Sequence, residues 1–193
     1  GLTSGLVAWY PFDGDAEDAS GNGNHGTVNG AILGTDRHGI SSKAYVFDGS
    51  NDFIQIPNHA SLNFANSLSL HFWINPNNWA GGGTEGIISK KSNDSSNGYV
   101  VYRDNNHLNE ITFRYRGDGG FQSYLKTNSF VSDNQWQNWT VTYQETCSKW
   151  YKNGQLQQVY DSLSNSSDMS NSNPLKIGYA DTWNYFYSGS IDE

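Results

Sequence analysis

Aromatic residues beside planar polar residues could bind a sugar, because a sugar ring has a flat apolar face and a rim of hydroxyl groups. The segment Asp181–Gly189 has this composition. Trp183 lies in a predicted loop with Asp181 and Asn184, and Tyr185 follows two positions later. We predict a binding surface here. The alternative is that the rings pack against the edge of the fold.

A second candidate surface lies in the segment Asn77–Glu85, where Trp79 stands among glycines with little neighbouring bulk to cover its ring. A predicted hairpin further along the chain could add polar and aromatic side chains, namely Arg114, Arg116, Asp118, Phe121 and Tyr124. From these two segments we take Trp79 and Arg116 as predicted binding residues. Trp79, like Trp183, could instead be a loop residue that plugs the edge of the fold.

An acidic loop near the start of the sequence could bind a cation. The segment Phe12–Gly26 contains Asp13, Asp15, Glu17 and Asp18, followed by a turn rich in glycine and asparagine. Calcium takes about six to eight oxygen ligands and accepts carboxylates together with backbone carbonyls. The spacing is not that of an EF-hand, so an ordinary turn stabilised by Asp and Asn side chains is the alternative.

The sequence does not show a catalytic constellation. Asp192 and Glu193 are adjacent, and a strand would send them to opposite faces. The five histidines are scattered, no Gly-x-Ser-x-Gly elbow is present, and the single cysteine, Cys147, shows no pairing with a histidine. We therefore predict that the protein is not an enzyme.

Composition excludes several classes of partner. The 193 residues carry a formal net charge of −8, with 11 Lys and Arg against 19 Asp and Glu. Nucleic acid is not an expected partner, because phosphate binding needs clustered basic residues. No apolar run approaches the ~20 residues that span a bilayer, so no membrane insertion is expected. The length favours a single domain over residues 1–193.

Short segments of alternating apolar and polar residues, separated by clusters of Gly, Asn, Asp and Ser, predict an all-β protein. The Asn153-Gly154 pair is a strong hairpin signal. The expected fold is a two-sheet antiparallel β-sandwich or jelly roll. The predicted strands cover Leu6–Phe12, Ala44–Gly49, Phe53–Pro57, Ser67–Asn75, Glu85–Lys91, Gly98–Asp104, a hairpin over Glu110–Thr127, Trp136–Gln144, a hairpin over Ser148–Val159, Pro174–Ala180 and a closing strand from Ser188.

The core of such a sandwich must be aromatic and β-branched. Aromatic residues make up 15% of the chain, whereas methionine occurs once. We assign seven aromatic residues to the core: Trp9, Phe47, Phe72, Trp73, Phe113, Trp139 and Tyr151.

Several motifs, in the same order, resemble the laminin-G-like modules of secreted bacterial proteins, which have a concanavalin A-like jelly-roll fold. The matching stretches are GLVAWYPFDG, DASGNGNHGTVNGA, KAYVFDGSNDFIQIP, SLSLHFWINP, WQNWTVTY, KWYKNGQL, KIGYA and YSGSIDE. Together they cover nearly the full length of the chain. The resemblance implies this fold for the whole chain.

The resemblance also implies a structural calcium ion. Family members commonly hold calcium between the loop after the first strand and the Asp of the IDE motif. On this sequence the resemblance implicates Asp18, Asn22, the backbone carbonyl of His25, and Asp192. Asp48 and Asp52 are second choices.

The resemblance leaves the ligand open, because the same fold carries sugar binders, adhesion modules, spacers and glycan-cleaving enzymes. The Glu-x-Asp-x-x-Glu run of the related glucanases and the Gln-x-His pair of similarly shaped alginate lyases do not occur. We expect a secreted or cell-surface carbohydrate-binding or adhesion module. Its partners would be a glycan or cell-surface polysaccharide and other domains of a parent protein. A structural spacer or protein-interaction domain is the alternative, and a lyase or hydrolase is the third possibility.

Overall fold

Strands form nearly all of the regular structure in the computed structural model, which describes residues 4–77, 83–104, 110–118, 122–144, 146–161, 163 and 168–193. A single-turn 3-10 helix, η1 (Ala60–Leu62), is the helical element of these residues, and they include no helix of the length and apolarity that a membrane crossing needs. The strands are β1 (Thr27–Asn29), β2 (Ile32–Thr35), β3 (Ser41–Asp48), β4 (Phe53–Ile56), β5 (Ser67–Pro76), β6 (Glu85–Lys90), β7 (Gly98–Arg103), β8 (Ile111–Arg116), β9 (Gln122–Lys126), β10 (Gln137–Gln144), β11 (Cys147–Lys152), β12 (Gln155–Asp161), β13 (Leu175–Ile177), β14 (Tyr179–Ala180), β15 (Tyr185–Phe186) and β16 (Ser188–Asp192).

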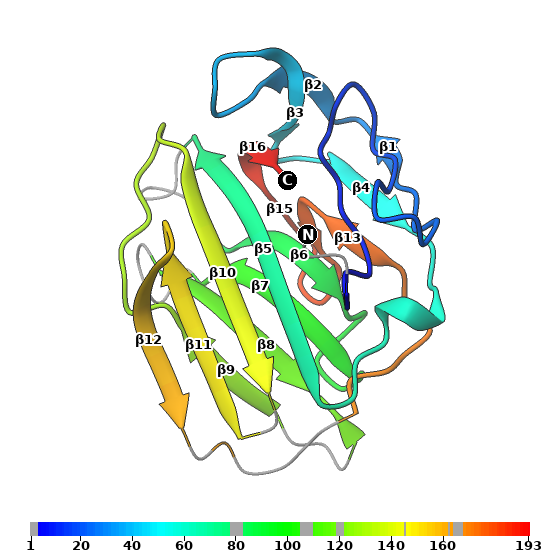
Figure 1. Ribbon diagram of the computed structural model, residues 1–193, viewed down its shortest axis with the longest axis vertical. Coiled ribbons are helices and arrows are strands. Elements are labelled where there is room, and N and C mark those ends of the chain that lie inside the picture. Colours follow the sequence, from blue (N-terminus) through cyan, green and yellow to red (C-terminus); the bar gives the residue numbers. More distant parts are fainter. Residues whose placement is uncertain are drawn as a thin grey trace.

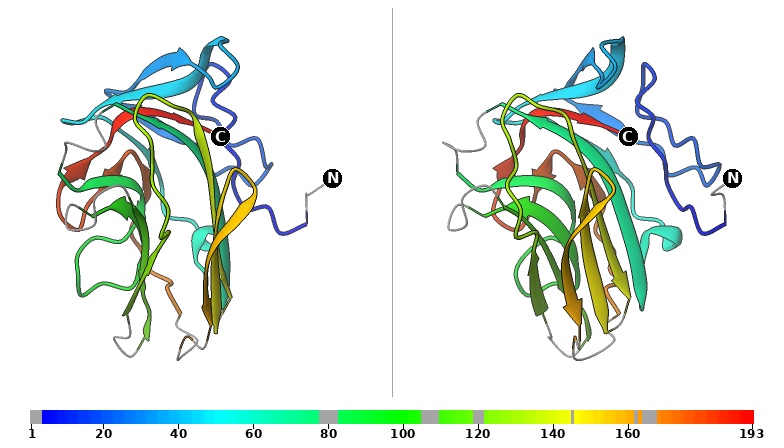
Figure 2. Two further views of the ribbon diagram at one scale, coloured as in Figure 1. Left: turned by 90° about the vertical axis from the view of Figure 1, so that its left-hand side faces the viewer. Right: turned by 60° about the vertical axis from the view of Figure 1, so that its left-hand side comes forward.

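Two seven-stranded antiparallel sheets lie face to face, which confirms the predicted sandwich (Figures 1 and 2). Sheet A has the strand order β1-β4-β13-β6-β7-β8-β9, and sheet B has the order β12-β11-β10-β5-β16-β3-β2. A separate two-stranded hairpin, β14–β15, completes the fold. Strands that are distant in sequence are neighbours in both sheets, as in a jelly roll.

Local sequence explains the longest strands. In β5, Leu68, Phe72 and Ile74 point into the core, whereas Ser69 and His71 are exposed, as the alternation predicted. The β11–β12 hairpin turns at Asn153 and Gly154, whose φ angles are 49° and 76°. Two positive φ angles in succession suit the twist of a two-residue hairpin, and Asn and Gly tolerate them best.

The core between the sheets is largely aromatic. Four of the seven predicted core aromatics are buried there: Phe47, Phe72, Phe113 and Trp139. The assignment of Trp9 was wrong, because its side chain is 41% exposed. Trp73 and Tyr151 are half-buried rather than buried. In β5 and β11 they alternate with inward-facing neighbours such as Phe72 and Trp150, so they lie on the outer side of sheet B.

The segment Leu6–Phe12 is not a strand in the structure, contrary to the prediction from its apolar alternation. It runs alongside the sandwich and is fastened by side chains, for example through the bond that Asn24 Nδ2 donates to the carbonyl of Val7 at 2.7 Å. Tyr10 and Phe12 are buried at its inner side. The alternation of apolar residues therefore identified the side of this segment that is buried. It did not identify a β-strand, because a strand also needs a neighbouring strand with which to form backbone hydrogen bonds.

The outer face of sheet A is covered near its centre. Every residue of β6 and β7 is buried, although a sandwich strand normally exposes one face. The β14–β15 hairpin lies against β6, and Ala180 and the partly buried Trp183 pack with Val100 and Tyr102 in a small second core. This cover forms the wall of the candidate site.

Candidate ligand-binding site

A pocket of about 280 Å³ opens where the β14–β15 hairpin meets the outer face of sheet A. We call it the aromatic pocket. Its lining comes from β7, β8, β9, the hairpin and the loops that flank β6 and β7. It consists of Thr84, Asp94, Tyr102, Asp104, Arg114, Tyr124, Trp183 and Tyr185.

Four aromatic rings line this pocket. The Trp183 ring centroid is 4.7 Å from that of Tyr102 and 6.2 Å from that of Tyr185. Tyr102 is buried beneath the others, whereas Tyr124 is 46% exposed and Tyr185 is 38% exposed. Burial, reinforced by the charge of Asp104, raises the pKa of Tyr102 above its usual value, so its hydroxyl stays protonated. The rings thus combine apolar faces with hydroxyl groups.

Arg114 forms the polar base of the aromatic pocket. Its guanidinium carbon lies 4.8 Å from the ring centroid of Tyr124 and 5.2 Å from that of Trp183, within the range of cation–π attraction. Its Nη1 donates to Asp94 Oδ1 at 2.5 Å. Stacking and ion pairing together hold the guanidinium plane in one orientation.

The predicted residues Asp181 and Asn184 fasten the hairpin and do not line the pocket. Lys176 Nζ lies 2.6 Å from Asp181 Oδ1, and Tyr179 donates its hydroxyl hydrogen to Asn184 Oδ1 at 2.9 Å. Asn184 has a φ of 59°, which suits the turn that returns the chain to β15. Because these bonds fix the turn of the β14–β15 hairpin, the Trp183 side chain is held in place before a ligand binds.

The other two predicted binding residues, Trp79 and Arg116, are not part of the described pocket lining. Trp79 lies outside the described residues. Arg116, two positions after Arg114 on β8, is half-buried and is not part of the pocket lining. The alternation of Ile111, Phe113 and Tyr115 places both arginines on the outer face, where Arg114 lines the pocket. A binding role for Arg116 stays a prediction.

The acidic N-terminal loop is organised around Asp18. Its Oδ1 accepts backbone N–H groups of Trp9 and Ser20 at 3.0 and 2.9 Å, and its Oδ2 accepts that of Asn24 at 2.9 Å. Burial raises the pKa of Asp18, but hydrogen bonds from Ser20, Trp9 and Asn24 outweigh this effect and hold the pKa below its usual value. Asp18 therefore acts as the centre of a turn.

The other predicted calcium ligands have partners elsewhere. Asn22 donates from Nδ2 to the carbonyl of Leu6 at 3.0 Å. In His25, whose backbone carbonyl is the predicted ligand, the side-chain Nδ1 accepts the backbone N–H of Asp18. Asp192 pairs with Arg37, although burial raises its pKa. Within the described residues no group of three or more His, Cys, Asp or Glu could hold a metal ion. The predicted set also includes an amide side chain and a backbone carbonyl, and calcium binding stays a prediction.

A larger cavity, about 760 Å³, lies between the N-terminal segment and the edge of β5. Its walls are mainly apolar, with aliphatic residues such as Leu6, Val7, Leu68 and Leu70 beside the aromatic rings of Trp9 and Phe64. Such walls suit an apolar chain rather than a hydroxyl-rich ligand. The aromatic pocket is therefore the better candidate for a sugar.

Comparison with known families supports the fold. The laminin-G profile of the concanavalin A-like lectin/glucanases superfamily matches residues 48–193. The chain belongs to this superfamily. No curated protein matches the sequence.

Solved structures of other members share the superfamily fold at low sequence identity. Domain 4 of AbnA, an extracellular arabinanase of Geobacillus stearothermophilus solved with arabinotriose, is 18% identical, with a TM-score of 0.72 over 97% of this chain and 89% of that one. The binding domain of Paraclostridial Mosquitocidal Protein 1 is 20% identical, with a TM-score of 0.75 over 100% and 49%.

A further superfamily neighbour is a structure of botulinum neurotoxin type C, a toxin described as entering cells through interaction with two ganglioside molecules. It is 17% identical, with a TM-score of 0.70 over 96% of this chain and 44% of that one. The chain thus spans less than half of these two toxin structures. One of these neighbours is a toxin binding domain and another was solved with a bound arabinotriose, although the superfamily also contains glucanases.

Proposed function

We propose that this superfamily member is a non-catalytic carbohydrate-binding module of an extracellular protein, and that its ligand occupies the aromatic pocket. The supporting observation is the Trp183 ring, which a fastened hairpin presents beside Tyr185 and Arg114. A sugar can stack its apolar face on such a ring and exchange hydrogen bonds with the neighbouring polar groups. Sugar ligands in related structures agree with this proposal.

A glycan array probed with the isolated chain tests the proposal, with plant, algal and animal-surface glycans included. Trp183→Ala should abolish the signal while leaving a cooperative melting transition. Phe130→Ala is the matched control, because Phe130 is 71% exposed and does not line the pocket. A blank array, or a variant that binds as the wild type does, would remove the aromatic pocket as the site.

The non-catalytic role is argued from the carboxylates of the pocket. Glycoside hydrolysis needs a protonated acid and a second carboxylate. Asp94, one of the two carboxylates that line the pocket, is held in an ion pair with Arg114 rather than left available for catalysis. We therefore expect no reducing-sugar release and no unsaturated product from any glycan that binds.

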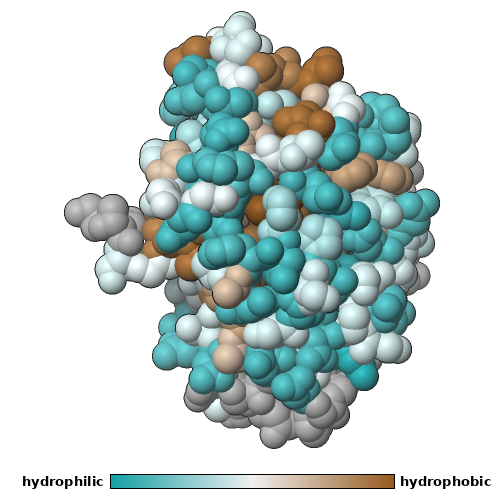
Figure 3. Space-filling model, turned by 90° about the vertical axis from the view of Figure 1, so that its right-hand side faces the viewer, coloured by the Kyte–Doolittle hydropathy of each residue, from teal (hydrophilic) through white to brown (hydrophobic). Residues whose placement is uncertain are grey.

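A second candidate function is contact with a neighbouring domain of a parent protein. Apolar side chains gather at the end of the molecule formed by β2, β3 and their connection (Figure 3). Ile32 is 65% exposed and Ile40 is 53% exposed, and Leu33 lies between them in sequence. Exposed apolar clusters of this kind commonly mark interaction surfaces.

Calcium remains a separate prediction for Asp18, Asn22, His25 and Asp192. Its support is the oxygen-rich composition of the loop. Melting the protein in EGTA and again with added calcium decides it. A rise of several degrees with calcium that Asp192→Asn removes would support the site, and unchanged melting would rule it out.

A further inference from the structure

The lining of the aromatic pocket carries more negative than positive charge. Apart from the tyrosines, its ionisable groups are the carboxylates of Asp94 and Asp104 and the guanidinium of Arg114. Arg114 is the group that could attract an anionic ligand, but its Nη1 already donates to Asp94. Asp104 adds a second negative charge, which contributes to the raised pKa of Tyr102.

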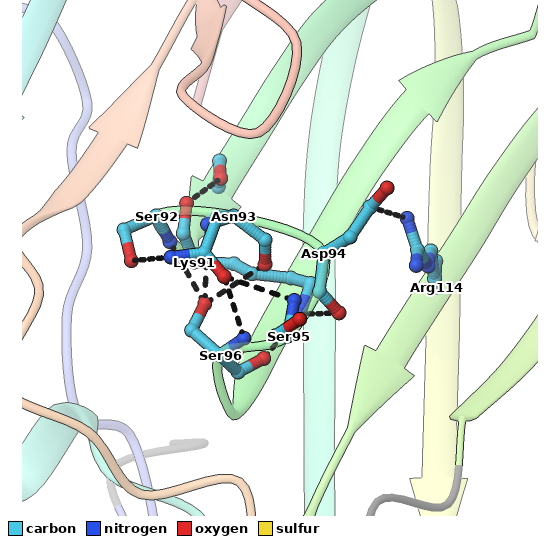
Figure 4. A network of polar contacts seen from close by, with 8 residues as sticks. Lys91, Ser92, Asn93, Asp94, Ser95, Ser96 and Arg114 are labelled. Atoms are coloured by element: carbon cyan, nitrogen blue, oxygen red, sulfur yellow. Dashed lines mark hydrogen bonds and ion pairs between the residues drawn. The ribbon is translucent and has the colours of Figure 1, made fainter.

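The loop that carries Asp94 is fastened from beneath by Lys91 (Figure 4). The Lys91 side chain is buried, and its Nζ donates to the backbone carbonyls of Asp94, at 3.4 Å, and Ser96. Asn93 Oδ1 accepts the N–H groups of Ser95 and Ser96, each at 2.9 Å. A buried ammonium at the centre of a tight loop keeps Asp94 over Arg114, so the position of the Asp94 carboxylate in the pocket is fixed.

Asp94 also presents an acceptor to the ligand. Its side chain is 61% exposed, and its ion pair with Arg114 uses Oδ1. Its Oδ2 accepts no hydrogen bond from the part of the chain that the structure describes. A sugar hydroxyl can donate to this oxygen while the ring rests on Trp183. A ligand carboxylate could not donate, because it is ionised at neutral pH and would face two like charges.

We propose that the aromatic pocket selects neutral sugars over uronic acids, a specificity that rests on the proposed carbohydrate-binding function. Asp94 supplies both the attraction for a hydroxyl and the repulsion of a carboxylate, and Asp104 strengthens the repulsion. Repulsion between like charges a few ångströms apart is substantial at a partly buried site. Specificity of this kind depends on the unfavourable contact as much as on the favourable one.

Matched trisaccharides test the selectivity, because α-1,4-galactotriose and α-1,4-trigalacturonate differ only at C6. The affinities for this pair are compared at pH 7 and low salt, together with those for a full array of neutral and uronate glycans. The expected result is that every strong binder is neutral and that the neutral member of any bound pair binds at least tenfold more tightly. A uronate glycan that equals or exceeds its neutral counterpart overturns the selectivity alone. An array with no binder overturns the carbohydrate-binding function itself.

Asp94→Asn tests the cause of the selectivity. This change removes one negative charge and keeps an oxygen acceptor, so the preference for the neutral member should fall at least threefold. Asp161→Asn is the matched control, because Asp161 is an exposed acid at the end of β12 in sheet B and should leave the preference unchanged. If Asp94→Asn melts as the wild type does and keeps the full preference, the charge assignment is wrong.

Discussion

The aromatic pocket and the Asp18 loop both contain a central carboxylate, and the two carboxylates have opposite roles. Asp94 is 61% exposed at its side chain and keeps one oxygen available. Asp18 is 7% exposed, and both of its oxygens accept backbone N–H groups. The number of backbone donors around a carboxylate therefore decides whether it stabilises a turn or stays available to a ligand.

The largest expected effect comes from Gly86→Ala, which should damage the aromatic pocket and the fold together. A Cβ atom at Gly86 would lie 2.2 Å from the backbone nitrogen of Ala180, so the β14–β15 hairpin would have to move away from β6. We expect a loss of about 1–3 kcal/mol in the free energy of unfolding and a loss of sugar binding. Urea unfolding and a sugar titration measure the two effects. Gly83→Ala is the control, because its Cβ would meet nothing within 4 Å.

Asp18→Ala should reduce stability without changing sugar affinity. The substitution leaves the N–H groups of Trp9, Ser20 and Asn24 without their acceptor. Loss of such partners costs about 1–3 kcal/mol, which urea unfolding can measure. If the free energy of sugar binding changed as much as the free energy of unfolding, the aromatic pocket and the Asp18 loop would be coupled. That result would contradict their separate roles.

Arg114→Lys should show the reverse pattern, with affinity reduced and stability nearly kept. An ammonium cannot lie flat between Tyr124 and Trp183 as the guanidinium does. We expect about a tenfold loss of affinity, equivalent to about 1.4 kcal/mol, by calorimetric titration. Arg116→Lys, on the same face of β8 but outside the pocket lining, should bind normally.

The smallest expected effect is a pH dependence of the Asp18 loop. Because the pKa of Asp18 is lowered in the folded state, its contribution to stability is complete above the unfolded value of about 3.9 and disappears as the pH falls through the folded value. The stability advantage of the wild type over Asp18→Asn should therefore shrink below about pH 4. A constant difference between pH 6 and pH 2.5 in urea unfolding would contradict this assignment.

Local pattern predicted most of the sandwich. Alternation located β5, β7 and β10 to within one or two residues, and Asn153-Gly154 located the β11–β12 turn. The short strands β1, β2 and β15 were missed, because two to four residues carry too little periodicity to show a pattern.

The candidate site was only partly predictable. Trp183 and Tyr185 were found because they are aromatic residues in a polar loop. Tyr102 was missed because an inward and an outward tyrosine look alike in a β-strand sequence, and only the hairpin folded over β7 shows which surface is used. The Asp192–Arg37 pair joins residues 155 positions apart, and no local signal connects them.

The strand β16 lies near the middle of sheet B, between β5 and β3, although it comes after all the other described strands in the sequence. The two halves of that sheet are joined through residues 188–192. During translation, the β2–β3 pair therefore cannot join the β5–β10–β11–β12 group in sheet B until residues 188–192 have left the ribosomal tunnel. A nascent chain arrested before Ser188 should remain sensitive to protease, because sheet B then lacks the strand that joins its β2–β3 pair to the β5–β10–β11–β12 group.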